Sequence, residues 1–115
     1  MNNEQLLKFF VSLCPDFEKY WDSEGDIYRE GDDYTIYGVC SVFSWYFRDN
    51  YREFSHRDLK TLFQKIEEIV SDEKDLDSAN ALCVCFLENI AGEEVGRFSR
   101  EFMGSKSKEF FDFWN

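Results

Sequence analysis

The sequence predicts an all-α protein, folded as a compact stack of about six to seven antiparallel helices. Apolar residues recur at helical spacing along most of the chain, and no stretch shows the sustained two-residue alternation of a β-sheet. Helix-breaking residues are scarce, with one proline and six glycines. A single helical domain, residues 1–115, is expected, because 43% hydrophobic side chains suffice for one core in a chain of this length.

The first two helices are predicted on either side of Pro15. Leu6, Phe10 and Leu13 fall on one face of an N-terminal helix that this proline ends. Pro15 is also well placed to begin a second helix through PDFEKYWDSE. The next stretch, GDIYREGDDY, is expected to be a polar loop.

Two longer helices are predicted in the middle of the chain. The first has a stripe at i, i+3, i+4, i+7 and i+11, formed by Ile36, Val39, Cys40, Phe43 and Phe47. The second begins at SHRD, which has the form of a capping box with Ser55 as the N-cap. Its apolar stripe consists of Leu59, Leu62, Phe63, Ile66, Ile69 and Val70.

An internal comparison indicates a structural repeat. A shift of 43 residues places the first of these stripes onto Ala79, Leu82, Cys83, Phe86 and Ile90. A period of about 40 to 47 residues is that of two-helix HEAT-like units, which bury their apolar faces against one another. The segment ALCVCFLENI is therefore expected to be a central core helix, apolar on all sides because it has neighbours on both.

No catalytic signature stands out, and we expect no enzyme activity, no metal and no cofactor. Cys83 and Cys85 lie two residues apart on a predicted helix, so their side chains point about 200° apart and cannot chelate one ion. With Cys14 and Cys40 they are expected to be reduced core thiols. The only histidine, His56, has no evident Cys or Ser partner.

Glu88 is the one acid expected on the apolar helix, where a carboxylate needs a partner. Two interpretations are open. It either makes a structural hydrogen bond or ion pair to a neighbouring helix end or to the SKSK turn, or it is a perturbed carboxylate at a functional site.

The N-terminal apolar run lacks a basic leader and a small-residue cleavage site, and so predicts a helix rather than a signal peptide. No window approaches the roughly 20 apolar residues of a membrane span. We expect a cytoplasmic protein that does not contact a membrane.

Charge is the strongest functional signal, with 24 acidic against 13 basic residues and a net charge of −11. Acids gather in two runs, in which Arg29 and Lys74 are the only bases, and both runs should emerge on one edge of a helical stack. The predicted partner-binding residues are Asp22, Glu24, Asp26, Glu30, Asp32 and Asp33 in the first run and Asp72, Glu73, Asp75 and Asp77 in the second.

Such a surface would repel nucleic acid and attract a basic protein. Nearby aromatic residues are candidate anchors for that partner, namely Tyr20, Trp21, Tyr28, Tyr34 and Tyr37. The alternative interpretation is that the acids only favour helix N-termini and keep the surface solvated.

The segment NALCVCFLENIAGE and the closing GSKSKEFFDFW resemble small, acidic, helical bacterial proteins of HEAT-like build. That group is similar to the immunity proteins of polymorphic toxin systems, including those of contact-dependent growth inhibition. The likeness spans about residues 16–114. It implies a protein that binds a toxin and blocks it, but it carries over no binding residue, because immunity surfaces diverge with their toxins.

Together these observations predict an immunity protein, monomeric or weakly dimeric alone, that occludes a basic toxin domain, with a nuclease as the best-fitting partner. Two other classes stay open. One is a general acidic interaction module that pairs with itself through aromatic surfaces. The other is a small metal-dependent hydrolase that uses Glu88 with further carboxylates.

Overall fold

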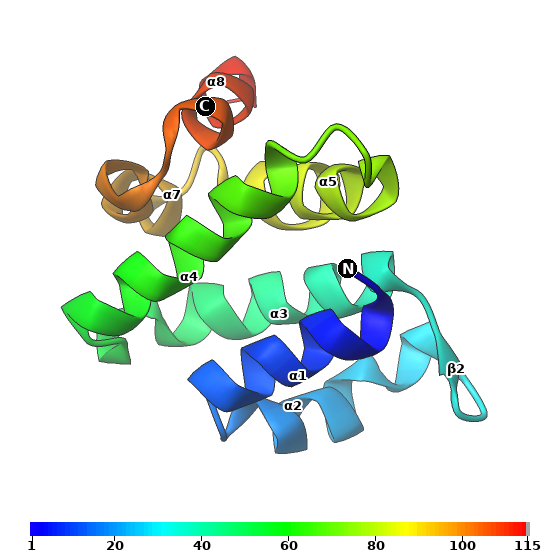
Figure 1. Ribbon diagram of the computed structural model, residues 1–115. Helices are drawn as coiled ribbons and strands as arrows, with labels where there is room; N and C mark the ends of the chain where they lie inside the picture. The colour runs from blue at the N-terminus through cyan, green and yellow to red at the C-terminus, as the bar shows by residue number, and fades with distance from the viewer. Residues whose placement is uncertain (115) are drawn as a thin grey trace.

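A computed structural model describes residues 1–114 and confirms the all-α prediction (Figure 1). Over these residues the chain forms seven helices, of which the fifth runs without a break from α5 through a π-helical segment into α6. Their bounds are α1 (Asn3–Leu13), α2 (Phe17–Glu24), α3 (Ile36–Asn50), α4 (His56–Val70), α5 (Leu76–Leu82) with the π segment (Cys83–Leu87) and α6 (Glu88–Ile90), α7 (Glu94–Ser99) and α8 (Ser105–Trp114).

Short polar side chains set several helix starts. The Ser55 hydroxyl accepts a hydrogen bond from the backbone N–H of Asp58 at 3.0 Å, so the predicted cap of α4 is confirmed. Thr35 caps α3 in the same way. Asn2 and Gln5 form a reciprocal capping box at the start of α1. Three 3₁₀ turns follow helices α2, α3 and α7, at Gly25–Tyr28, Tyr51–Glu53 and Arg100–Phe102.

The core lies around α3 and is rich in stacked aromatic rings. Phe43 stacks on Phe10 of α1 with ring centroids 3.9 Å apart, and it also contacts Phe86 of the π segment at 5.7 Å. Phe47, one turn further along α3, contacts Phe63 of α4 at 5.9 Å. Because each of these rings is fully buried, α1, α3, α4 and the π segment share one hydrophobic cluster.

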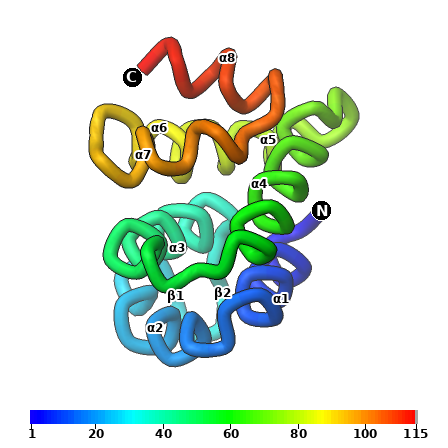
Figure 2. Tube along the Cα trace, turned by 90° about the vertical axis from the view of Figure 1, so that its left-hand side faces the viewer, coloured from blue at the N-terminus to red at the C-terminus, as the bar shows by residue number. Residues whose placement is uncertain are grey.

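The helices matched by the internal repeat lie beside each other. Helix α3 packs against the π segment (Figure 2). The helix after α3 is α4, whereas the chain after α6 is divided into α7 and α8, of which α8 contacts α4. The Asn89 amide donates to the Ser44 hydroxyl at 3.1 Å, which ties α6 to α3. Two helical pairs are therefore stacked, as the repeat predicts, with α1 and α2 covering the other side of α3.

The prediction of a plain polar loop after α2 was wrong in detail. Arg29–Glu30 (β1) pairs antiparallel with Asp33–Tyr34 (β2), and Gly31 supplies the positive φ of +65° at the tip. Strands of two residues are too short to show an alternating pattern. This hairpin projects from the body of the protein beside the start of α3 (Figure 1).

The expectation that the helix from Ala81 to Ile90 is buried on all sides was also wrong in part. Val84 is 47% exposed, and Cys83 and Cys85 are only half-buried. The cause is that α3 and α4 cover one side of the helix and α8 a second, while a third stays open. The remaining apolar residues, including Phe86, are buried.

Candidate partner-binding site

The first acidic run surrounds the hairpin. We call its six members the hairpin acids: Asp22, Glu24, Asp26, Glu30, Asp32 and Asp33. All six are exposed. They lie on the end of α2, the 3₁₀ turn, both strands and the turn between the strands, so a short chain segment holds them close together.

Arg29 does little to offset the charge of the hairpin acids. Its guanidinium donates to the backbone carbonyls of Trp21 at 2.7 Å and Asp22 at 2.6 Å, and it lies over the Trp21 ring. The cation thus caps the C-terminal end of α2, where the helix dipole is negative. Asp26 is its only carboxylate partner among the described residues, at 3.5 Å. The hairpin therefore keeps a strong negative charge.

The second run consists of Glu67 and Glu68 at the end of α4 and of four acids in and just after the turn to α5. We call its four predicted site residues the turn acids: Asp72, Glu73, Asp75 and Asp77. Three of them are exposed, but Asp75 is held by the fold. It caps α5 through Ser78 and accepts a hydrogen bond from the ammonium of Met1 at 2.5 Å. The hydrogen bond to that ammonium, followed by those from Ser78, lowers the pKa of Asp75 to about 2.

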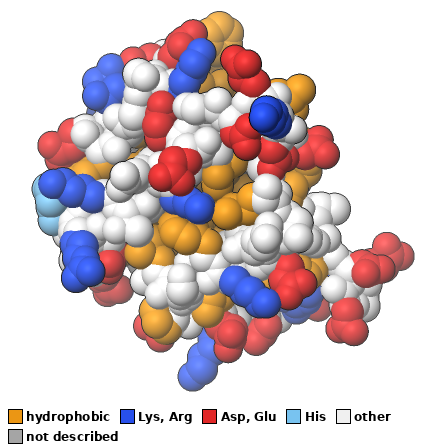
Figure 3. Space-filling view, viewed as in Figure 1, with side chains coloured by type: hydrophobic (Ala, Val, Ile, Leu, Met, Phe, Trp, Pro, Cys, Tyr) orange, Lys and Arg blue, Asp and Glu red, His pale blue; other side chains and the backbone are white. Residues whose placement is uncertain are grey.

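The start of α1 links the two runs. The Ser78 hydroxyl donates to the carbonyl of Met1 at 2.6 Å, and the Asn3 amide donates to the carbonyl of Tyr34 at the base of the hairpin, at 2.8 Å. The hairpin acids and the turn acids therefore emerge on one edge of the molecule, as the stacking argument predicts. In Figure 3 carboxylates lie at the lower right, where the hairpin projects, and at the upper right, with uncharged surface between the two groups. We call this surface the acidic edge.

The predicted aromatic anchors divide into two groups. Trp21 is buried, and Tyr20 and Tyr34 are half-buried, packed edge-on against Tyr46 and Trp21. These three serve mainly the core. Tyr28 and Tyr37 are each 38% exposed and are available to a partner.

Sequence reasoning missed Ile27, an exposed apolar residue among the hairpin acids. Its side chain is 77% exposed between Asp26 and Tyr28, in the middle of the hairpin acids. Apolar side chains ringed by polar ones are typical of the centre of protein interfaces. The available signal was one apolar residue inside an otherwise polar stretch.

The structure reassigns the carboxylate role that the sequence suggested for Glu88. Glu88 is half-buried and makes no ion pair or side-chain hydrogen bond among residues 1–114. Glu67 of α4 instead holds the SKSK turn, accepting from the backbone N–H groups of Lys106 at 3.0 Å and Ser107 at 2.9 Å. The prediction that a carboxylate holds the SKSK turn was therefore right, but the carboxylate is that of Glu67 and not that of Glu88.

Glu67 acts as a cap supplied from another helix. The Ser107 hydroxyl also donates to it at 2.8 Å, and a Cβ at Gly104 would lie 2.3 Å from the Glu67 carboxyl carbon. Partial burial favours a raised pKa, but the hydrogen bonds from Ser107, Lys106 and Ser71 lower the pKa of Glu67 overall. The carboxylate thus stabilises the start of α8 as an anion at a helix N-terminus.

The four cysteines are free thiols, as expected, but only Cys14 and Cys40 are buried. Burial raises the pKa of Cys14 to about 12 and that of Cys83 to about 11, and it raises the pKa of Cys40 well above its ordinary value. Within residues 1–114 no group of three or more His, Cys, Asp or Glu side chains is placed to hold a metal ion. No helix in the described part of the chain is long and apolar enough to cross a membrane.

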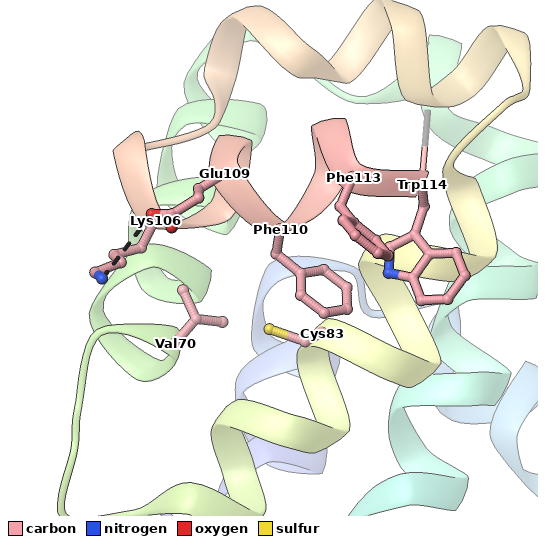
Figure 4. A pocket seen from close by; sticks show the side chains of 7 residues that line it. All are labelled: Val70, Cys83, Lys106, Glu109, Phe110, Phe113 and Trp114. Atoms are coloured by element: carbon pink, nitrogen blue, oxygen red, sulfur yellow. Dashed lines mark ion pairs between the residues drawn. The ribbon is translucent and has the colours of Figure 1, made fainter.

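A different surface lies at the far end of the chain. A cavity of about 470 Å³ opens beside α8, lined by Val70, Cys83, Lys106, Glu109, Phe110, Phe113 and Trp114. In Figure 4 the rings of Phe113 and Trp114 lie side by side at the end of α8, while Phe110 points toward Cys83. Phe113 is 79% exposed and Trp114 is 48% exposed. We call Phe110, Phe113 and Trp114 the α8 patch.

Comparison with known families finds one match, which covers residues 7–115. The chain belongs to the DUF7674 family. That family is described as a domain of unknown function. Neither the curated proteins nor the solved structures contain a match to the chain. The surface chemistry is therefore the ground on which a function can be proposed.

Proposed function

We propose that the protein binds a basic partner protein through the acidic edge and neutralises it by stoichiometric occlusion, as an immunity protein does for its toxin. The observation that carries the proposal is the position of the two acidic runs on one edge, joined by Met1 and Asn3. All of the ten acids except Asp75 are exposed. Repulsion among so many like charges lowers the stability of the fold, and a bound partner of opposite charge would reduce that repulsion.

A nuclease toxin is the partner that fits best. Such an enzyme needs a basic groove to hold its phosphate substrate, and a projecting acidic hairpin can occupy that groove in place of nucleic acid. The likeness of NALCVCFLENIAGE and GSKSKEFFDFW to immunity proteins supports the same class. A toxin of this kind acts inside the cell, so the proposal includes a cytoplasmic location.

The arrangement of the acids favours binding over catalysis. They spread along an edge rather than converging on one point, and no group of three or more His, Cys, Asp or Glu side chains in residues 1–114 is placed to hold a metal ion. A spread of negative charge is well suited to steering a basic partner, because attraction acts over a Debye length of about 8 Å at physiological salt. Fast association matters when a toxin must be captured before it acts.

The test is a binding measurement against the basic C-terminal domain of a toxin encoded beside the gene of this protein, with its catalytic residue inactivated. We expect a one-to-one complex whose association slows as salt rises. An unrelated basic protein such as cytochrome c is the control, and it should bind far more weakly at physiological salt. Equal binding of the two would show that the edge has no specific partner and would contradict the proposal.

A further inference from the structure

We infer that the α8 patch is a self-association surface that receives the α8 patch of a second copy of this chain. This interface lies apart from the acidic edge and does not depend on the function proposed above. Its product is a weak dimer whose two acidic edges stay free.

The position of α8 in the stack gives the first argument. Each earlier helix pair is covered by the next, and α8 packs on α4 and the π segment through Ser107 and Phe111, both fully buried. Its last turn carries Phe113 and Trp114, which are 79% and 48% exposed. Stacked-helix proteins normally end in a polar face, so two exposed aromatic rings on the last turn of α8 favour a contact at that turn.

The local charge indicates which molecule makes this contact. Residues 95–114 carry four basic and three acidic side chains, whereas the rest of the chain is strongly acidic. Two copies with a net charge of −11 repel each other wherever acids dominate, so this end is where they can approach.

The rim of the α8 patch is also complementary to itself. Lys106 and Glu109 lie 4.0 Å apart on α8, and across a two-fold axis the lysine of one copy can face the glutamate of the other. A surface that binds a strongly basic or strongly acidic partner would carry charges of one sign at its rim. The mixed rim fits a second copy instead.

The end of the protein is rigid enough to present this patch. Arg100 makes two hydrogen bonds to Asp112, at 2.8 and 2.7 Å, and Glu67 holds the first turn of α8. The aromatic side chains therefore need little ordering on contact, which lowers the entropic cost of association.

Sedimentation velocity over a range from micromolar to millimolar protein tests the inference. The mass of the parent should rise from 13.8 kDa toward twice that value, and the rise should be steeper at high salt, because screening weakens the repulsion between copies. Phe113→Ser should stay monomeric over the whole range. Ile27→Ser is the matched control, since Ile27 is as exposed as Phe113 but lies at the other end, and it should dimerise like the parent.

A second measurement needs no variant. Trp114 is the most exposed of the three tryptophans, so quenching of tryptophan fluorescence by acrylamide should fall as protein concentration rises. A parent that stays monomeric up to millimolar concentration at high salt overturns the inference. Dimerisation of Phe113→Ser equal to that of the parent overturns it as well. Neither result bears on the binding of a toxin domain, which is measured separately.

Discussion

The two ends of the molecule differ in what they expose. The acidic edge presents nine unburied carboxylates around one exposed isoleucine, whereas the α8 end presents exposed aromatic rings among nearly balanced charges. One fold thus separates two surfaces, for which we propose different partners: a basic protein for the first and a second copy of this chain for the second. The difference implies opposite responses to salt: binding at the acidic edge weakens and association through α8 strengthens.

The core joins the two ends, and removing a central ring should disable both. Phe86 is fully buried and contacts the rings of Phe43 at 5.7 Å and Phe47 at 5.5 Å. We expect Phe86→Ala to lower the free energy of unfolding by about 3 to 5 kcal/mol. Urea unfolding measures this loss. Val84→Ala, at an exposed position of the same helix, is the control and should cost far less.

If Phe86→Ala cost less than about 1 kcal/mol, the two ends would not share one core. Partner binding and self-association should decline together in this variant. They should separate in the surface variants Ile27→Ser and Phe113→Ser.

The second prediction concerns α8 alone. Glu67→Ala removes the acceptor for the first N–H groups of α8. Because these hydrogen bonds go to a charged group, we expect their loss to lower the free energy of unfolding by about 1 to 3 kcal/mol in total. Glu68→Ala, on the same helix, is the control and should change stability by less than about 0.5 kcal/mol. Hydrogen exchange should show faster exchange in α8 of the Glu67 variant and no change in the hairpin. Equal exchange in α8 of both variants would contradict the capping role.

Much of this architecture follows from sequence patterns. The stripes of α3 and α4 predict buried faces because a buried helix face forces apolar residues to recur at helical spacing, and the Ser55 cap follows from a local motif. The 43-residue repeat places α3 beside the helix containing Phe86. These features depend on residues close in sequence or on a simple period.

The remaining features depend on contacts that no local pattern records. Glu67 lies in an ordinary acidic stretch, and its donors lie about 40 residues away. The signal available was Gly104, which precedes α8 and has no side chain to accept a hydrogen bond from its first N–H groups. The hairpin is too short to alternate. The open side of Val84 depends on which helices pack nearby, and helical periodicity alone does not fix that.

The third prediction concerns Asp75, which stabilises the fold, unlike the exposed acids beside it on the acidic edge. The pKa of Asp75 in the folded protein, about 2, lies below its ordinary value of 3.8. The carboxylate therefore contributes stability above about pH 4, and this contribution is lost as the pH falls toward 2. The difference in unfolding free energy between the parent and Asp75→Asn should shrink over that range.

Urea unfolding at several pH values follows this difference. Asp77→Asn is the control, because Asp77 is exposed and makes no side-chain hydrogen bond or ion pair among the described residues, and its curve should run parallel to that of the parent. A constant difference between the parent and Asp75→Asn would show that the bonds to Met1 and Ser78 add nothing to stability.

The acidic edge as a partner-binding surface is the central claim. A variant that reverses four of its free acids tests it: Asp32→Lys, Asp33→Lys, Glu73→Lys and Asp77→Lys. Asp75 is left unchanged because it caps α5. The matched control makes the same change in net charge at exposed acids elsewhere: Asp49→Lys, Glu53→Lys, Glu93→Lys and Glu101→Lys.

The direct measurement is surface plasmon resonance of both variants against the inactivated toxin domain at low and at physiological salt. Exposed charges contribute about 0.2 to 1 kcal/mol each, so four together should weaken binding by about 1 to 4 kcal/mol. We predict that the edge variant associates several-fold more slowly than the control and loses most of the salt dependence. If the edge variant and the control associate equally fast, the position of the acids does not matter, and the acidic edge is not the partner-binding surface.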